Sequence, residues 1–212
     1  MKDLIIVADG SFGLDVRKII LAVNENRKNK GQECPYRIKG FLAAGEAADI
    51  RNLQPLLGTV EDRQPEQDEY YVMGILNPKK KEQAVRTLKD RGARFETIRA
   101  PWVMAHLDMQ FPEGCVIAAQ SIMDSARIGK FVTLFHSMVG FDAFVGDYAS
   151  VMAYVNITTA HIGERAFIGD NSVVIRKTVH ENAVVTANSV VVKDVKAGTT
   201  VMGNPARRLK EQ

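Results

Sequence analysis

The sequence predicts an α/β domain of Rossmann type, followed by a parallel β-helix of hexapeptide repeats and a short C-terminal helix. Two observations carry this prediction. In the first half, strand-like apolar segments alternate with segments whose apolar residues recur at helical spacing. In the second half, apolar residues return every five or six positions, a period of neither an α-helix nor a lone strand. The expected division is residues 1–101 for the first domain, 102–114 for a linker and 115–212 for the β-helix with its tail.

In the first half, the order of strands and helices predicts a small parallel sheet. A helix is expected after the turn Gly10–Gly13, and a second begins at Pro78, because proline is favoured in the first turn of a helix, and stops at Gly92. The turn lacks the full G-x-G-x-x-G pattern, and Glu46 is the nearest acidic residue after the second strand, which argues against a dinucleotide site. The expected strands are Leu4–Ala8, Tyr36–Ala43, Tyr70–Ile75 and a segment near Phe95–Ile98.

In the second half, the period of about six residues predicts triangular coils, each made of three hexads. The aliphatic residue of each hexad points into the prism, and glycine or another small residue fits the tight corners. Ile162-Gly163, with Ala166 four positions after Ile162, is typical of the pattern. The recurring apolar residues are Ile122, Ile128, Leu134, Val139, Val145, Val151, Ile157, Ile162, Ile168, Val174, Val179, Val185 and Val191.

The bulk composition narrows the class of function. A net charge of only +3 gives no electrostatic case for nucleic acid or an anionic membrane. The short apolar N-terminal run and the absence of long apolar stretches predict a cytoplasmic protein without a membrane span. Cys34 and Cys115 lie far apart and form no metal motif, and no two of the four histidines have the close spacing of a metal site, so no metal is expected.

Taken together, the two halves resemble bacterial sugar acyltransferases of the sialic-acid O-acetyltransferase and bacillosamine N-acetyltransferase family. The resemblance covers nearly the whole chain and rests on Ile75-Leu76-Asn77-Pro78, the hexads and the closing segment Val201-Met202-Gly203-Asn204-Pro205-Ala206. It implies a left-handed β-helix, a homotrimer, acetyl-CoA as cosubstrate in a groove between adjacent β-helices, and a sugar or nucleotide-sugar acceptor held by the N-terminal domain.

The resemblance also assigns roles to positions in this sequence. Gly10, Ser11, Phe12 and Phe141 fall at substrate-binding positions, and Ser150, Ala187, Lys193, Gly203 and Asn204 at coenzyme-binding positions, with Arg207 and Arg208 as further phosphate ligands. Phe12, Phe141 and Ser150 each replace a family histidine, the one at Phe141 being catalytic. Ala43 and Ala44 replace acidic residues that meet the nucleotide. These losses predict weak or absent binding of UDP- or CMP-sugars, because each buried polar contact contributes about 1–3 kcal/mol.

Acetyl transfer needs a base that takes the proton of the attacking hydroxyl or ammonium group, and phenylalanine cannot do this. We expect His136 to serve as a relocated base with Asp142 as its orienting partner; the alternative is a solvent-facing or subunit-interface histidine. His106, His161 and His180 are expected to be structural or exposed. Two functions remain open: an acetyl-CoA-dependent acyltransferase acting on a sugar-like acceptor, or a catalytically degenerate homologue that serves as a trimeric binding or regulatory scaffold.

Overall fold

The computed structural model describes residues 1–45, 54–106 and 108–209. The chain divides into two compact units. The first comprises Met1–Pro101 with Glu113–Val116, and the second comprises Trp102–Pro112 with the chain from Ile117 onward. Part of the segment expected as a linker therefore belongs to the second unit, where Met104 forms a parallel bridge with Ser121. No helix in the described part of the chain is long and apolar enough to cross a membrane.

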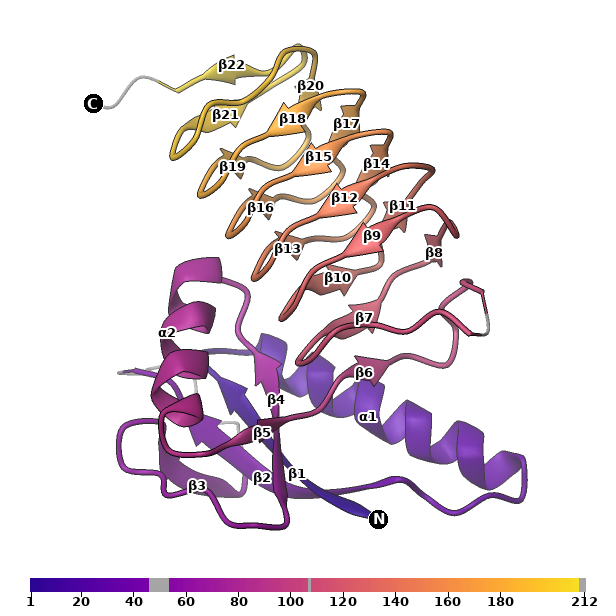
Figure 1. Cartoon of the computed structure of the whole chain (residues 1–212), viewed down its shortest axis with the longest axis vertical. Helices are drawn as coiled ribbons and strands as arrows, with labels where there is room; N and C mark the ends of the chain where they lie inside the picture. Colours follow the sequence, from indigo (N-terminus) through magenta and orange to yellow (C-terminus); the bar gives the residue numbers. More distant parts are fainter. Residues whose placement is uncertain (46–53, 107, 210–212) are drawn as a thin grey trace. The chain divides into compact units, whose positions relative to one another are not determined.

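The first unit contains a five-stranded parallel sheet in the order β3-β2-β1-β4-β5. β1 lies at the centre of the sheet, with β2 and then β3 on one side and β4 and then β5 on the other. Figure 1 shows α1 and α2 on opposite faces of the sheet. In such a sheet the carboxyl ends of the strands form a crevice where ligands bind. The elements are β1 (Lys2–Ala8), α1 (Phe12–Asn29), β2 (Tyr36–Ala43), β3 (Leu56–Thr59), β4 (Glu69–Gly74), α2 (Pro78–Lys89), β5 (Arg94–Phe95) and β6 (Ile98–Arg99).

Local sequence explains the ends of these elements. Leu4 to Ala8 are all 0% exposed, as expected for the central strand of a sheet covered on both faces. Asn77 caps α2, since its side-chain oxygen accepts the backbone N–H groups of Lys79 and Lys80 at 3.1 Å each. The strands and helices expected from the sequence are present to within a few residues, and β3 is the one strand of this sheet that the sequence did not predict.

The second unit is a three-sided prism of stacked parallel strands, which fits the left-handed β-helix expected from the sequence (Figure 1). Side 1 contains β7 (Val116–Ala118), β10 (Thr133–Phe135), β13 (Ser150–Val151), β16 (Phe167–Ile168), β19 (Val184–Val185) and β21 (Thr200–Met202). Side 2 contains β8 (Ser121–Ile122), β11 (Met138–Val139), β14 (Asn156–Thr158), β17 (Val173–Ile175) and β20 (Val190–Val191). Side 3 contains β9 (Arg127–Ile128), β12 (Phe144–Val145), β15 (His161–Ile162) and β18 (Thr178–Val179).

The hexad residues fill the prism, and the corners show why small or permissive residues are needed there. Leu134, Val139 and Val145, one from each side of a coil, are all 0% exposed. A Cβ on Gly163 would lie 2.6 Å from the backbone nitrogen of Glu181 in the next coil, so only glycine fits. Other corner residues adopt left-handed backbone conformations, as at Asp142, where φ is 52°.

The expected C-terminal helix is wrong for the part of the chain that the structure describes. The segment after β21 turns back as β22 (Arg207–Arg208), antiparallel to β21. The Ala206 N–H donates to the Val190 carbonyl at 2.8 Å, and the Leu209 N–H donates to the Thr200 carbonyl at 2.9 Å. At its open edge the last coil has backbone N–H and C=O groups without a partner strand. The C-terminal segment forms hydrogen bonds with these groups, so its own backbone groups are paired as well. Residues 210–212 lie outside the described residues.

Candidate functional site

A basic pocket of about 340 Å³ lies at the C-terminal end of the β-helix. Its cationic lining consists of Lys193 and Lys196, which follow β20, and Arg207 and Arg208 of β22. The sequence had singled out Lys193, Arg207 and Arg208 as phosphate ligands, and the structure brings these three together. It adds Lys196, which belongs to no recognised motif and was missed.

The four cations of the basic pocket are exposed, and within residues 1–45, 54–106 and 108–209 none of them forms an ion pair. Among the described residues that line the pocket the one carboxylate is that of Asp194, which accepts a hydrogen bond from the Thr178 backbone N–H at 2.9 Å. Four unpaired positive charges around one concavity create a positive potential that attracts polyanions. Arginine and lysine are also the side chains that bind phosphate groups by charge-assisted hydrogen bonds.

The other coenzyme-binding candidates lie outside the lining of the basic pocket. Gly203 and Asn204 form the turn between β21 and β22, where the Gly203 N–H donates to Ser189 Oγ at 3.2 Å. Ala187 is an exposed corner residue. Ser150 is 0% exposed in β13 on side 1. Their assignment to the coenzyme site stays a prediction.

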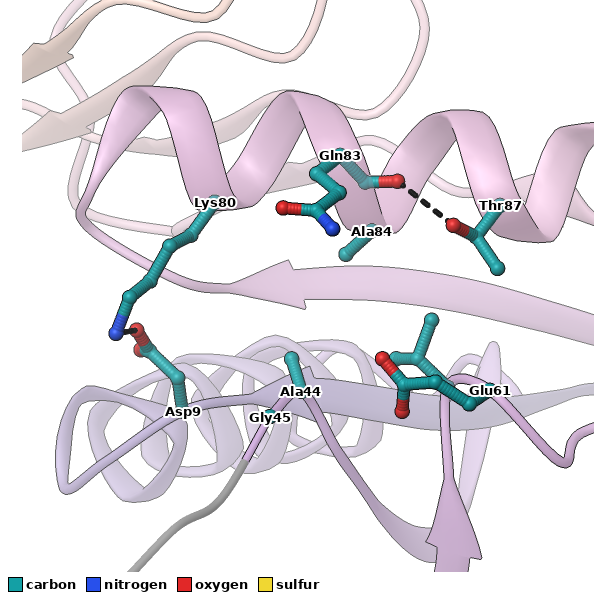
Figure 2. A pocket seen from close by; sticks show the side chains of 9 residues that line it. Asp9, Ala44, Gly45, Glu61, Lys80, Gln83, Ala84 and Thr87 are labelled. Carbon is teal, nitrogen blue, oxygen red and sulfur yellow. Dashed lines mark hydrogen bonds and ion pairs between the residues drawn. The ribbon is translucent and has the colours of Figure 1, made fainter.

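A second pocket, of about 250 Å³, lies in the first unit at the carboxyl ends of its strands. Asp9 follows β1, Ala44 follows β2 and Glu61 follows β3, while Lys80 and Gln83 reach the pocket from α2 (Figure 2). Asp9 and Lys80 form an ion pair at 3.5 Å. Two carboxylates, an amide and one ammonium group favour a neutral, hydroxyl-rich or amino-bearing ligand in this strand-end pocket. Glu46, the acidic residue noted after the second strand, lies outside the described residues.

The glycine turn after β1 plays a packing role. Phe12 is 7% exposed and begins α1, so its side chain belongs to the core. A Cβ on Gly74 of β4 would lie 3.0 Å from the Cα of Gly13, so the two glycines let α1 approach the sheet. Gly10 and Ser11 are absent from the lining of the strand-end pocket. The substrate-binding role expected of this turn stays a prediction. Glu61, which lines the strand-end pocket, was not considered in the sequence analysis because β3 was not predicted.

The structure does not bring His136 and Asp142 together. His136 lies at the corner between sides 1 and 2, and Asp142 lies at the corner between sides 2 and 3, with β11 between them. The His136 ring stacks on Trp102, with centroids 6.1 Å apart and planes at 3°. Asp142 is exposed, and its N–H donates to Ser125 Oγ at 2.9 Å. Within one chain Asp142 therefore does not contact His136, and the roles expected of these two residues stay predictions.

Phe141 is 62% exposed beside Asp142 and presents an apolar surface at this corner. The corner one coil further on stacks directly on it, since the Thr159 N–H donates to the Phe141 carbonyl at 2.7 Å. This second corner leads into β15, whose first residue is His161. Among the described residues, no group of three or more histidine, cysteine, aspartate or glutamate side chains is arranged to hold a metal ion.

Comparison with known proteins identifies the fold. No protein-family model matches the sequence. The acetyltransferase domain of PglB from Neisseria gonorrhoeae FA1090 is similar, with a TM-score of 0.80 and 18% identity over 99% of this chain and 100% of that chain. WeeI from Acinetobacter baumannii AYE has a TM-score of 0.80 and 23% identity, over 99% and 100%. A histidine mutant of perosamine N-acetyltransferase from Caulobacter crescentus, in complex with CoA and GDP-perosamine, has a TM-score of 0.78 and 18% identity, over 100% and 98%.

These similarities extend over both units of the chain, and at identities below one quarter they show a shared fold. The shared fold is a parallel β-helix preceded by an α/β unit.

Proposed function

We propose that this protein is an acyltransferase that moves the acetyl group of acetyl-CoA to an amine or hydroxyl of a sugar-like acceptor. The observation that carries the proposal is the basic pocket, where Lys193, Lys196, Arg207 and Arg208 are free of ion pairs within the described part of the chain. Coenzyme A carries a pyrophosphate and a further phosphate on its ribose, and a cluster of unpaired lysine and arginine side chains matches this charge. The CoA bound in the similar perosamine N-acetyltransferase supports the same assignment.

The acceptor site is the strand-end pocket of the first unit. Its volume of about 250 Å³ suits one monosaccharide or one nucleoside moiety, and Asp9, Glu61 and Gln83 offer acceptors for hydroxyl or amino groups. The GDP-perosamine in the similar enzyme is an amino sugar attached to a nucleotide, and we propose an acceptor of that class. The strand-end pocket has two carboxylates and only one lysine. We therefore propose that this pocket binds the acceptor mainly through its hydroxyl or amino groups, and not through its phosphates.

We also propose a homotrimer, supported by the outer surface of side 2. Met138, Ile175 and Val192 are 40–45% exposed on this side or at its end, and Val173 and Val190 extend the same apolar surface. The polar groups in its middle, Asn156 and Thr158, hydrogen-bond each other at 3.0 Å. An exposed, mainly apolar surface of this kind marks an interface, and identical chains around a cyclic axis cover it in a closed assembly.

The direct test is an acetyl-transfer assay that follows release of the coenzyme thiol. Purified protein is mixed with acetyl-CoA and a panel of acceptors: GDP-perosamine, free amino sugars and the corresponding neutral sugars. We expect thiol release and a stable acetylated product with GDP-perosamine or with at least one of the free amino sugars. Binding of acetyl-CoA without transfer to any acceptor in the panel contradicts the proposal and favours the scaffold alternative.

A further inference from the structure

Side 3 of the β-helix carries an outward-facing column of side chains, of which only His161 was discussed from the sequence, as structural or exposed. Strand pairing places Arg127, Phe144, His161 and Thr178 in register, one from each strand of this side. Each is followed by an aliphatic residue that points inward, such as Ile162, which is 0% exposed. Because successive side chains of a strand point to opposite faces, the inward direction of the aliphatic residues makes these four side chains point outward.

His161 is held in one orientation by this column. Its ring stacks on the ring of Phe144 with centroids 4.6 Å apart and planes at 25°. On its other side, Phe144 receives the guanidinium of Arg127, whose carbon lies 5.7 Å from the ring centroid. The imidazole of His161 is exposed, and no described residue hydrogen-bonds to its ring nitrogens. A fixed ring with a free nitrogen is suited to accept a proton from a bound molecule.

The other histidines at candidate positions are less suited. Nδ1 of His106 accepts the Asp108 backbone N–H at 3.3 Å, which puts the remaining proton of the neutral ring on Nε2. His136 stacks on Trp102 at the corner between sides 1 and 2, away from side 3.

The column on side 3 leads directly to the basic pocket. Val195, which lines the basic pocket, forms a parallel bridge with Val179 at the top of side 3. The Asp194 carboxylate of the same pocket accepts the Thr178 N–H at 2.9 Å. His161 in turn pairs with Thr178. Adjacent strands are about 4.8 Å apart, so His161 lies about 10 Å below the floor of the basic pocket on the same face.

We propose that the pantetheine arm of acetyl-CoA runs from the basic pocket down the outer surface of side 3, and that His161 is the catalytic base. The proposal rests on the proposed function. The arm between the pyrophosphate and the sulfur is longer than two rungs of the β-helix, so the thioester reaches the level of His161. A free nitrogen of the imidazole takes one proton from the acceptor's hydroxyl or neutral amine as that oxygen or nitrogen attacks the thioester carbon; an acceptor that arrives as an ammonium ion first gives one proton to water. The carbon–sulfur bond breaks, and the imidazolium returns the proton to the departing thiolate, giving the acetylated acceptor and coenzyme A.

The first experiment needs no acceptor. Binding of acetyl-CoA is confirmed by calorimetry, and diethyl pyrocarbonate then labels exposed imidazoles with and without saturating acetyl-CoA, with mass spectrometry at each histidine. We expect acetyl-CoA to slow labelling of His161 at least about fivefold while His106 labels at an unchanged rate. Equal labelling rates at His161 with and without bound acetyl-CoA overturn the proposal. Absence of acetyl-CoA binding instead removes the proposed function, which separates the two failures.

The second experiment separates catalysis from binding, with acetyl-CoA and GDP-perosamine as substrates. His161→Ala is expected to lower kcat about a hundredfold or more, the usual contribution of a general base, and to leave the KM for acetyl-CoA within about threefold. Added imidazole is expected to restore part of the activity, which a structural defect would not allow, and His106→Ala serves as the control of full activity. Full activity in His161→Ala, or a loss confined to His136→Ala, overturns the assignment. If the wild type does not acetylate GDP-perosamine, the labelling result alone decides whether acetyl-CoA lies on side 3.

Discussion

Lys81 of α2 is 0% exposed, and lysine is among the residues that are least often fully buried. Burial lowers the pKa of Lys81 to about 7, against an opposing electrostatic effect from the Cys115 thiol, which is also buried. At neutral pH the folded protein therefore holds this lysine close to the point where it loses its charge.

Replacing Lys81 tests this placement through the pH dependence of stability. The unfolded lysine keeps its proton up to about pH 10.4, so between pH 7 and 10 the unfolded state binds more protons than the folded state. The free energy of unfolding should therefore rise with pH in this window, by up to about 1.4 kcal/mol per unit from this group. We expect Lys81→Met to remove that slope in denaturant unfolding at pH 7, 8 and 9, and exposed Lys79→Met to retain it. Equal slopes in wild type and Lys81→Met contradict the placement.

At the residue scale, sequence reasoning succeeded where a residue belonged to a recognisable segment. Lys193, Arg207 and Arg208 lie in or beside the closing motif, and they line one pocket. Glu61 was missed because it follows β3, a four-residue strand whose sequence, Leu-Leu-Gly-Thr, does not alternate apolar and polar residues. His161 was placed on the surface correctly, but its stacking on Phe144 depends on a partner one coil away, which residue spacing alone does not reveal.

Among structural elements, the corners between sides 1 and 2 contain three buried serines, Ser137, Ser172 and Ser189, and the first two lie in contrasting environments. Ser172 Oγ donates to the Thr186 carbonyl at 2.9 Å and accepts the Ser189 N–H at 3.3 Å. Ser137 Oγ is buried with no hydrogen-bond partner among the described residues. Removing the hydrogen-bonded hydroxyl of Ser172 should therefore change the free energy of unfolding differently from removing the unpaired hydroxyl of Ser137, although the two serines occupy equivalent positions.

We expect Ser172→Ala to lower the free energy of unfolding by about 1–2 kcal/mol, because it leaves the Ser189 N–H and the Thr186 carbonyl without this partner. Ser137→Ala is the matched control and should be neutral or stabilising, because it deletes a hydroxyl that has no partner. Denaturant unfolding of both variants measures the difference. A loss in Ser137→Ala as large as that in Ser172→Ala would show that the Ser137 hydroxyl is satisfied in solution.

The elements of the β-helix could be predicted because each hexad requires the same residue types: an aliphatic residue that points inside and a small residue at the corner. Val145, Ile162 and Val179, one from each of three successive coils, were assigned to the core from spacing alone and are all 0% exposed. The C-terminal segment was predicted from its local sequence to be a helix, and this prediction was wrong. Arg207 and Arg208 form β22 instead, because the open edge of the last coil offers backbone partners that no local pattern encodes.

For the whole molecule, the assembly prediction concerns the outer surface of side 2. Val173→Glu places a carboxylate on this mainly apolar surface, between Asn156 and Val190, and burying an unpaired charge at an interface costs several kcal/mol. We expect the wild type to have the mass of a trimer in light scattering at micromolar concentration, and Val173→Glu to have the mass of a monomer. Arg17→Glu, on the exposed surface of α1, should remain trimeric. A monomer mass for the wild type would contradict the proposed assembly.

The central claim is that the basic pocket binds the phosphates of acetyl-CoA. It is tested most directly by calorimetric titration of the protein with acetyl-CoA at two salt concentrations. We expect saturable binding that weakens with salt, because the cations are exposed, and that weakens about tenfold or more, a loss of about 1.4 kcal/mol, in the double variant Lys193→Ala/Arg207→Ala. Arg17→Ala, which removes an exposed cation of the first unit, should bind like the wild type. Absence of binding at millimolar acetyl-CoA, or equal affinity in the wild type and the double variant, would contradict the account.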